Sequence, residues 1–411
     1  MYKSRFQKVC MIGLGYIGLP TAAVFASRKV NVVGVDINQH AVDTINQGKI
    51  HIVEPELDIL VHATVKDGYL KAQTTPEAAD AFIVAVPTPF KGEDHEPNLD
   101  YIQAAAKSLA KFLKKGDLVV LESTSPVGAT EKMAQWLAEE RPDLTFPQQN
   151  GEESDIRVAH CPERVLPGHV IKELVENDRI IGGMTAKCTA SAIELYKIFV
   201  EGDCIATNAR TAEMAKLTEN ASRDVQIAFA NELSILCDKM GIDVWELITL
   251  ANRHPRVNIL QPGCGVGGHC IAVDPWFIVN AYPEDARLIN TARLVNDGKP
   301  HFVVSKVKDA LKDIKNPKVA CLGLAFKPDI DDLRESPALE ITKMLSDIEG
   351  YEVLAVEPNV EELPKVLENR KNVKLVELEE ALSDADVVVV LVKHREFVGL
   401  DSEKVIDFVN C

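Results

Sequence analysis

The feature that most constrains the fold is an alternation of short β-branched runs with longer helical stretches. In the first part of the chain these runs occur at Val9–Leu14, Val30–Asp36, Ala81–Val86, Leu118–Ser123 and Arg157–His160. Strands that alternate with helices are typical of βαβ units, whose strands pair in parallel. This part of the chain is therefore predicted to be an α/β domain on a parallel sheet.

The pattern changes in the middle of the chain and then returns. A long helix is expected over Thr211–Met240, closed by Gly241, and a second helix over Val244–Asn252. Further strands are expected at Lys318–Leu324, Val353–Val356, Val373–Val376, Asp386–Val392 and Lys404–Phe408. We predict two Rossmann-like, doubly wound parallel-sheet domains, residues 1–205 and 313–411, joined by a central helical segment over residues 206–312.

A glycine-rich turn follows the first expected strand. The turn reads Gly13-Leu14-Gly15-Tyr16-Ile17-Gly18, and Asp36 ends the next strand. The first glycine would permit a tight turn, the second the approach of a pyrophosphate, and the third close packing of helix on strand. Asp36 would accept hydrogen bonds from both ribose hydroxyls and repel a 2′-phosphate. The pattern predicts NAD as the cofactor, bound by this turn, Tyr16 and Ile17 included.

Two further loops are expected where strands end. Thr88 lies in Val86–Pro89 and Thr124 in Ser123–Pro126. Ligands bind beyond the carboxyl ends of the strands in open parallel sheets, so both threonines are candidates for contacts to cofactor or water. Each could equally be a residue that caps a turn.

A second group of polar residues lies on the long helix. Lys216, Asn220 and Arg223 are spaced i, i+4 and i+7, which places them on one helical face. This spacing is also that of an ordinary solvated stripe. Downstream, four glycines in Gly263–Gly268 precede Cys270, and Asp274 follows four residues later, a spacing compatible with one helical face. A thiol near a cation is held as the reactive thiolate, so Cys270 is a candidate nucleophile.

Composition excludes several classes of protein. The chain has 411 residues and a net charge of −17, which argues against nucleic acid as a partner. It lacks the run of about 20 apolar residues that a membrane span needs, and it begins without a signal-like segment, so a soluble, cytoplasmic protein is expected. Nine scattered cysteines without a C-x-x-C pair indicate neither a disulfide framework nor a structural zinc site, and we expect no metal.

Seven motifs in order resemble the UDP-glucose/GDP-mannose dehydrogenase family over essentially the whole chain. They read GLGYIGLP, VPTP, STSPVG, CPER, AKLTEN, GVGGHC–VDP and AFKPDIDDLRESP. The resemblance implies oxidation of a sugar C6 alcohol to a carboxylate with two NAD and no free aldehyde. Asp274, through a water, and Lys216 would deprotonate the alcohol, and Lys216 and Asn220 would stabilise the oxyanion. Cys270 would form a thiohemiacetal and then a thioester, and Glu163, with a water ordered by Thr124, would serve its hydrolysis.

The resemblance also implies the contacts to cofactor and substrate. Arg334 would reach NAD. The UDP-sugar would be bound by Lys216, Asn220 and a further set of residues, namely Arg164, Val165, Arg223, His254, Arg256, Gly267, Phe326, Lys327 and Lys393. The C-terminal domain would bind the nucleotide diphosphate, and the central segment would form a homodimer in which His254 and Arg256 could act across the subunit boundary.

Two departures narrow the substrate. His269 precedes the cysteine and Val273 precedes Asp274, where UDP-glucose dehydrogenases usually have Ser and Lys. This pattern is similar to the branch that oxidises UDP-N-acetylhexosamines, and the stretches Cys161–Gly168 and His254–Asn258 favour UDP-N-acetyl-D-mannosamine. UDP-N-acetyl-D-glucosamine and UDP-glucose are alternatives. The product would feed a bacterial surface polysaccharide such as enterobacterial common antigen or capsule.

Two other functions fit these residues less well. A two-electron hydroxy-acid dehydrogenase would explain Lys216 and Asn220. It would explain neither the cysteine loop nor a whole third domain, here the α/β domain after the helical segment. A non-catalytic NAD-binding regulator would give no reason to keep Lys216, Asn220, Cys270, Asp274 and Glu163 together.

Overall fold

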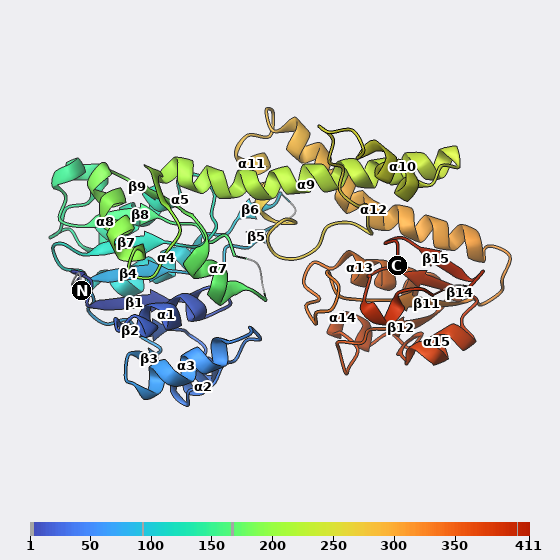
Figure 1. Cartoon of the computed structure of the whole chain (residues 1–411), viewed down its shortest axis with the longest axis horizontal. Helices are drawn as coiled ribbons and strands as arrows, with labels where there is room; N and C mark the ends of the chain where they lie inside the picture. The colour runs from blue at the N-terminus through green and yellow to red at the C-terminus, as the bar shows by residue number, and fades with distance from the viewer. Residues whose placement is uncertain (1–3, 93, 166–167, 401) are drawn as a thin grey trace. The chain divides into compact units, whose positions relative to one another are not determined.

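The computed structural model describes residues 4–92, 94–165, 168–400 and 402–411 (Figure 1). The chain divides into two compact units, residues 1–218 and 219–411, each with a sheet and buried cores of its own. The long helix α9 (Ala209–Met240) contains the division between them. Among the described helices, none combines the length and the apolar character needed to cross a bilayer.

The first unit is built on an eight-stranded sheet in the order β10-β9-β8-β7-β4-β1-β2-β3. The strands from β3 to β8 in this order pair in parallel, as predicted. The bounds are β1 (Lys8–Ile12), β2 (Asn31–Val35), β3 (Leu70–Gln73), β4 (Ala81–Val84), β7 (Leu118–Leu121), β8 (Arg157–His160), β9 (Arg179–Gly183) and β10 (Cys204–Asn208), with a separate hairpin of β5 (Phe90–Lys91) and β6 (Glu96–Pro97).

The sheet is not wholly parallel, which corrects the prediction at one edge. β9 pairs antiparallel with β8, and β10 runs parallel to β9. Neither strand was expected, because β9 reads Arg-Ile-Ile-Gly-Gly and β10 reads Cys-Ile-Ala-Thr-Asn, and glycine, alanine and asparagine weaken the β-branched signal.

Alternation along β1 explains the two cores of this unit. Val9 and Met11 face one core with α1, α3, α7 and α8, whereas Cys10 and Ile12 face the other with α4 and α5. Helices therefore cover both faces of the sheet (Figure 1). The helices are α1 (Gly18–Ser27), α2 (Gln39–Asn46), α3 (Leu57–Lys66), α4 (Asp100–Ala110), α5 (Ala129–Glu140), α6 (Pro147–Asn150), α7 (Val170–Glu176) and α8 (Ala186–Tyr196).

Helices dominate the first part of the second unit. The rest of α9 is followed by α10 (Val244–Ala251), α11 (Asp274–Ala281) and α12 (Arg287–Leu311). A buried ion pair joins α12 to α9, because Arg293 Nη1 lies 2.6 Å from Asp224 Oδ1. Asn296 on α12 also donates to Asp224 and accepts a hydrogen bond from Asn231.

The rest of the second unit is a wholly parallel five-stranded sheet in the order β13-β12-β11-β14-β15. Its strands are β11 (Lys318–Leu322), β12 (Glu352–Val356), β13 (Val373–Leu375), β14 (Val387–Val390) and β15 (Val405–Asp407). Its helices are α13 (Pro337–Ser346), α14 (Lys365–Glu368) and α15 (Leu378–Asp384). All five strands lie within or close to the ranges predicted from the sequence.

The two sheets share a local design. Gly13 after β1 and Gly323 after β11 have φ of +93° and +96°, and each donates its N–H over 2.8 Å to the last residue of the next strand, Val35 or Val356. The acidic residue that follows, Asp36 or Glu357, then accepts the N–H of Leu14 or Leu324.

Candidate active site

The space around each glycine of the turn after β1 shows where a side chain could fit. A Cβ on Gly13 would lie 2.2 Å from the carbonyl oxygen of Ala85, and one on Gly18 would lie 1.8 Å from the carbonyl oxygen of Gly13. Neither position can hold a side chain. A Cβ on Gly15 would meet nothing within 4 Å. The backbone at Gly15 is therefore open to a ligand, beside the first turn of α1, and this fits a bound pyrophosphate.

Asp36 is held in place at the end of β2. Its Oδ2 accepts the N–H of Leu14 and its Oδ1 the N–H of Asn38, each over 2.9 Å. A carboxylate has further lone pairs on both oxygens, so it can still accept hydroxyl donors such as those of a ribose. Tyr16 is 42% exposed and Ile17 half-buried, while Ile37 is 91% exposed beside Asp36. Ile37 therefore offers an exposed apolar side chain next to Asp36, and it was not among the residues predicted for the site.

The loops after β4 and β7 are joined by hydrogen bonds. Ser123 Oγ accepts the N–H of Val86 over 2.9 Å and donates to the carbonyl oxygen of Val86 over 2.7 Å. Thr88 Oγ1 donates to the carbonyl oxygen of Thr124. The structure thus brings Thr88 and Thr124 together at the carboxyl ends of neighbouring strands, and the Thr88 hydroxyl helps to tie the loops to each other.

Glu163 follows β8 and is nearly buried, with 8% of its surface exposed. Its Oε1 accepts the N–H of Arg164 over 2.6 Å, and its Oε2 lies 2.7 Å from Nη2 of Arg179. Arg164 and Val165 are half-buried, and Arg164 also donates to the carbonyl oxygen of Asp178. Leu166 and Pro167 of the same motif lie outside the described residues.

The helix predicted to carry Lys216, Asn220 and Arg223 is α9, and all three lie on it. Lys216 is half-buried and Arg223 exposed. Asn220 Nδ2 donates to Oδ2 of Asp274, which is only 4% exposed. Two predicted catalytic residues that lie 54 positions apart are therefore in direct contact within the second unit.

Cys270 lies just before α11, not on it. Asp274 is the first residue of that helix, and its N–H donates over 2.8 Å to the carbonyl oxygen of Cys270. The four-residue spacing corresponds to a single helix-like turn that leads into α11, in which the N–H of Val273 also donates to the carbonyl oxygen of Cys270. The turn still holds the half-buried Cys270 next to the buried carboxylate through the backbone.

The glycine loop before Cys270 packs against the segment that follows β11. A Cβ on Gly267 would lie 2.6 Å from Phe326 Cβ and from the carbonyl oxygen of Glu335. Gly268 has a φ of +81° and donates its N–H to the carbonyl oxygen of Arg334 over 3.1 Å. The structure thus brings Gly267, Phe326 and the Arg334 backbone together. At its start the loop is anchored by Asn231, which accepts the N–H of Gly263 over 2.9 Å.

The remaining predicted residues lie on exposed or tethered segments. His254, Arg256 and Lys327 are exposed. The Arg334 side chain forms an ion pair with Asp332, Nη2 to Oδ2 at 2.6 Å, and Lys393 donates to the carbonyl oxygen of Asn410. The side chains of His254, Arg256 and Lys327 can take up ligand contacts without opening a core.

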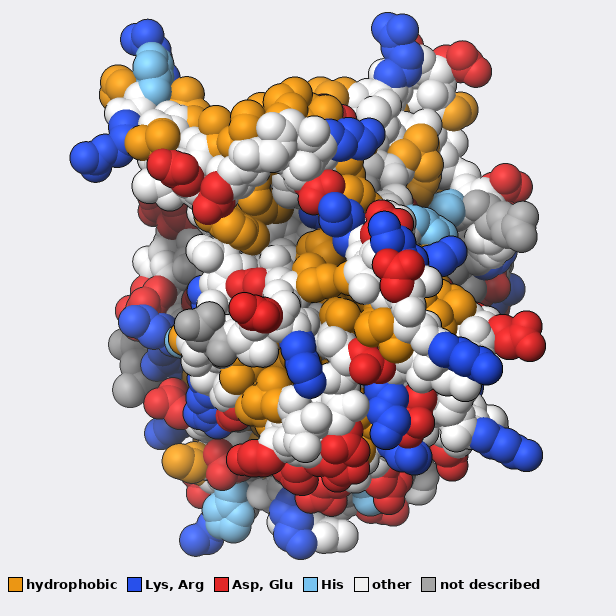
Figure 2. Space-filling view, turned by 90° about the vertical axis from the view of Figure 1, so that its right-hand side faces the viewer, with side chains coloured by type: hydrophobic (Ala, Val, Ile, Leu, Met, Phe, Trp, Pro, Cys, Tyr) orange, Lys and Arg blue, Asp and Glu red, His pale blue; other side chains and the backbone are white. Residues whose placement is uncertain are grey.

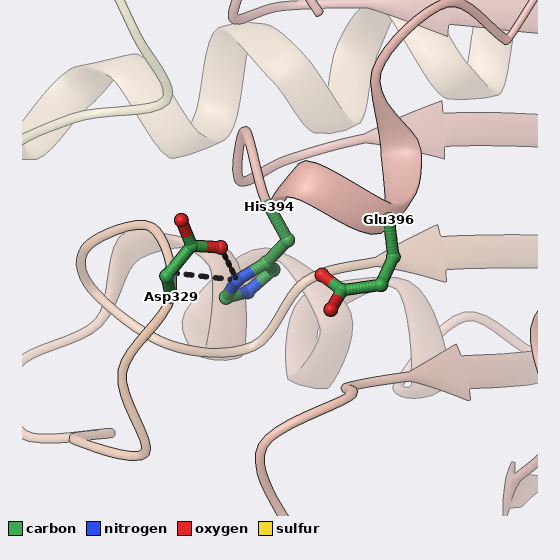
Figure 3. A group of neighbouring side chains, drawn as sticks. All are labelled: Asp329, His394 and Glu396. Carbon is green, nitrogen blue, oxygen red and sulfur yellow. Dashed lines mark hydrogen bonds and ion pairs between the residues drawn. The ribbon is translucent and has the colours of Figure 1, made fainter.

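Asp329, His394 and Glu396 form a group in which one ligand atom from each lies within 4.8 Å of the others (Figure 3). His394 Nδ1 accepts the N–H of Asp329 over 2.9 Å, and Nε2 lies 3.0 Å from Glu357 Oε2. Both ring nitrogens are therefore engaged within the protein, and Glu396 is paired with Arg395. This donor set does not favour a metal ion.

Comparison with known proteins agrees with this geometry. Three parts of the chain match the UDP-glucose/GDP-mannose dehydrogenase family: its NAD binding domain over residues 7–200, its central domain over 210–298 and its UDP binding domain over 320–410. The chain belongs to this family. It is accordingly an NAD-dependent oxidoreductase, and the predictions of the family and of NAD as cofactor are confirmed.

Several relatives of this dehydrogenase are similar along their whole length. A UDP-N-acetyl-D-mannosamine dehydrogenase of Campylobacter jejuni is 72% identical, over 98% of this chain and 100% of the relative. An NDP-N-acetyl-D-galactosaminuronic acid dehydrogenase of Ralstonia nicotianae is 65% identical, over 97% and 93%. The structure of the UDP-D-ManNAc dehydrogenase of Pyrococcus horikoshii superposes with a TM-score of 0.88 at 39% identity, covering 98% of this chain and 95% of that one.

Sequence motifs missed some residues that support the site of this dehydrogenase. Glu122 and Arg179 lie behind Glu163, and Asn231 anchors the cysteine loop. The signal was weak. Glu122 lies in the expected strand Leu118–Ser123, so it is a charge placed where burial was predicted. Arg179 begins β9, a strand that was not predicted, so no such signal marked it.

Proposed function

We propose that this enzyme oxidises UDP-N-acetyl-D-mannosamine at C6 to UDP-N-acetyl-D-mannosaminuronate. The overall reaction consumes one water and two NAD and releases two NADH and three protons. The contact of Asn220 with Asp274, next to Cys270 in the backbone, carries the proposal of covalent chemistry. The name of the Campylobacter relative, at 72% identity, supports the choice of sugar.

NAD, when bound at the glycine turn and Asp36, would accept one hydride in each oxidation. Asp274, through a water, and Lys216 take the proton of the C6 alcohol. The hydrogen bond from Asn220 fixes one oxygen of Asp274 and so orients the other. Lys216 and Asn220 are also the donors that stabilise negative charge on the sugar oxygen.

Cys270 makes the second oxidation possible. Its thiolate attacks the aldehyde carbon to give a thiohemiacetal, which the second oxidation converts to a thioester. Water then attacks the thioester, Glu163 accepts a proton from that water, and Cys270 leaves as the thiolate. Thr124, at the end of the neighbouring strand, is proposed to order the water.

For the substrate, we propose that the diphosphate and sugar are bound by a mainly basic set. Arginine suits phosphate through its paired N–H donors and lysine as a point charge. The set comprises Arg164, Val165, Arg223, His254, Arg256, Gly267, Phe326, Lys327 and Lys393, and Arg334 is assigned to NAD. A cytoplasmic place of action and use of the product in a surface polysaccharide belong to the same proposal.

We also propose a homodimer formed through the central helices. Phe229, Leu236 and Met240 are 52%, 40% and 65% exposed, and their spacing of seven and four residues puts them on one face of α9. Leu250 on α10 is 62% exposed. Figure 2 shows hydrophobic side chains gathered on the upper part of the face that it draws. An apolar stripe of this kind on a helix that already buries its other face is typical of an interface.

The decisive test is NADH yield at completion with limiting sugar. UDP-N-acetylmannosamine, UDP-N-acetylglucosamine, UDP-N-acetylgalactosamine, UDP-glucose and GDP-mannose are compared. We expect two NADH per UDP-N-acetylmannosamine and little from the others. A preference for UDP-N-acetylgalactosamine would favour the specificity named for the Ralstonia relative, and one NADH per sugar would contradict the thioester route.

Cysteine variants separate the chemistry from the sugar. Cys270→Ser should lose nearly all uronate formation, because an alkoxide leaves far less readily than a thiolate. Cys264→Ser is the matched control, since Cys264 lies in the same loop but is 5% exposed and packed in the core. It should keep the yield of two NADH. Uronate formation by Cys270→Ser at near the wild-type rate would rule out the covalent step.

A further inference from the structure

The first unit buries one guanidinium between two carboxylates. Arg179 is 4% exposed, with Nη2 at 2.7 Å from Glu163 Oε2 and Nη1 at 3.4 Å from Glu122 Oε1. Tyr196, which is fully buried on α8, donates its hydroxyl to the same Glu122 oxygen over 3.1 Å. The guanidinium also lies 5.1 Å from the centre of the Tyr196 ring. A core position with this much charge needs a reason beyond packing.

The reversed strand at the edge of the sheet creates this contact. In the antiparallel pairing of β8 with β9, Ala159 lies opposite Gly183 and His160 opposite Gly182. Continuing this register past the end of β8 puts Glu163 opposite Arg179. A parallel β9 would present its last residue there instead of its first, so the reversal is what delivers the guanidinium to Glu163.

The balance of charge shows which of the two carboxylates the guanidinium neutralises more fully. One cation faces two carboxylates in a place closed to solvent, so only one of them is fully compensated. Burial and, to a lesser extent, the charge of Glu163 raise the pKa of Glu122 to about 8, against the opposing effect of Arg179. Glu163 is the closer partner of the guanidinium, at 2.7 Å against 3.4 Å for Glu122.

We propose that Arg179 is a positioning residue for the hydrolytic step, that it orients the Glu163 carboxylate, and that Glu122 and Tyr196 hold Arg179 in place. The proposal rests on the function proposed above for Glu163. In that step a water oxygen bonds to the thioester carbon, the carbon–sulfur bond breaks, the Cys270 thiolate leaves, and one water proton passes to Glu163. No electrons are transferred. Removing Arg179 should slow this step while leaving the two oxidations intact.

The test uses the full-length enzyme with NAD and the UDP-sugar that it oxidises best. Arg179→Met, Arg179→Lys, Tyr196→Phe and Glu163→Gln are compared with wild type by pre-steady-state NADH release, by intact mass of the quenched enzyme and by the pH dependence of the steady-state rate. Arg293→Lys is the matched control, because Arg293 is an equally buried arginine whose ion-pair partner is Asp224 instead of Glu163.

For Arg179→Met we expect three changes. The steady-state rate falls about tenfold or more, a sugar adduct on the enzyme accumulates, and the acidic limb of the pH profile moves up by about one pH unit, since the carboxylate has lost the positive charge that favours its ionised form. Arg179→Lys should restore part of the rate and of the pH profile, because it keeps the charge. Tyr196→Phe should move both readouts in the same direction by less, and Arg293→Lys should move neither.

The inference is overturned if Arg179→Met slows both oxidations and hydrolysis alike, with no adduct and an unchanged acidic limb. If Arg179→Met does not fold, Arg179→Lys and Tyr196→Phe decide by the same two readouts. Glu163→Gln distinguishes the role proposed for Glu163 from the role proposed for Arg179. Its failure to accumulate an adduct would overturn the role proposed for Glu163, whereas an adduct in Glu163→Gln but in no Arg179 or Tyr196 variant would overturn this inference alone.

Discussion

Lys299 is a buried lysine in the middle of α12, 2% exposed, and its ammonium donates to Ser234 Oγ. Burial lowers its pKa to about 8, against the weaker raising effects of Cys264 and Asp238. The unfolded chain keeps an ordinary lysine, with a pKa of about 10.4. The charged form is therefore costly in the folded state, and the cost is complete at neutral pH, where both states carry the proton.

Replacing Lys299 by methionine should accordingly stabilise the protein. At neutral pH we expect Lys299→Met to raise the free energy of unfolding by about 1–2 kcal/mol. The gain should shrink as pH rises from about 8 to about 10.4, because the folded wild type then loses its proton before the unfolded chain does and recovers stability. Urea unfolding at several pH values measures this. Lys308→Met, at an exposed residue of the same helix, is the control and should change little. A gain that does not vary with pH would contradict the argument.

Among the elements, β12 and the segment after β14 are joined by a buried carboxylate. Glu357 Oε2 accepts the N–H groups of Leu324 over 2.7 Å and of Ala325 over 2.9 Å, and lies 3.0 Å from Nε2 of His394. Burial acts to raise the pKa of Glu357, but the hydrogen bonds from His394, Leu324, Asn359 and Ala325 outweigh it and lower the pKa to about 2. The same carboxylate thereby fixes the loop that leads to Phe326 and Lys327.

Glu357→Gln should destabilise the fold by about 2–3 kcal/mol at neutral pH, because it removes a charged acceptor from several buried donors. Since the folded pKa is depressed, the stability that Glu357 contributes is present above the unfolded value of about 4.3 and is lost as pH falls toward 2. Urea unfolding should therefore show a smaller acid dependence in the variant. Glu352→Gln, whose ion pair with Lys374 lies at the surface with Glu352 half-buried, serves as control and should change stability by less than about 0.5 kcal/mol. Equal effects of the two would contradict the prediction.

At the scale of the whole molecule, the exposed apolar stripe of α9 and α10 predicts self-association. Met240→Asp combined with Leu250→Asp should convert the dimer to monomer, because each buries a charge in the proposed interface. Light scattering coupled to size exclusion measures the mass. Val366→Asp on α14, where Val366 is 51% exposed, is the matched control and should leave the dimer intact. A double variant that is still dimeric would place the interface elsewhere.

Local periodicity predicted most of the fold. Strands such as Arg157–His160 and the long helix that became α9 have strong, regular patterns, and they were found within a few residues. β9 and β10 were not predicted because their composition is mixed. The antiparallel direction of β9 has no signature in the local sequence. Strand direction depends on where the chain returns to the sheet, which is a property of the tertiary structure.

The chemistry of the site was legible in the sequence because it depends on residue type and spacing. The glycine turn with Asp36 and the cysteine loop with Asp274 are motifs that are continuous in the sequence. Their backbone conformations require glycine at particular positions, and each motif includes one acidic residue. Family membership and NAD followed from these residues. The contact of Asn220 with Asp274 required the fold to be known, since 54 residues of chain separate them.

What only the tertiary structure decided is the environment of each charge. Glu163 was predicted from the sequence, but its contact with Arg179 was not. The burial of Glu122, Tyr196 and Lys299 was not predicted either. The spacing of Cys270 and Asp274 was compatible with one helical face, and the structure joins them by one backbone turn just before α11. Residue identity sets the chemistry that a side chain can perform, but burial and partners set its charge and direction, and these arise from packing between segments that are remote in the chain.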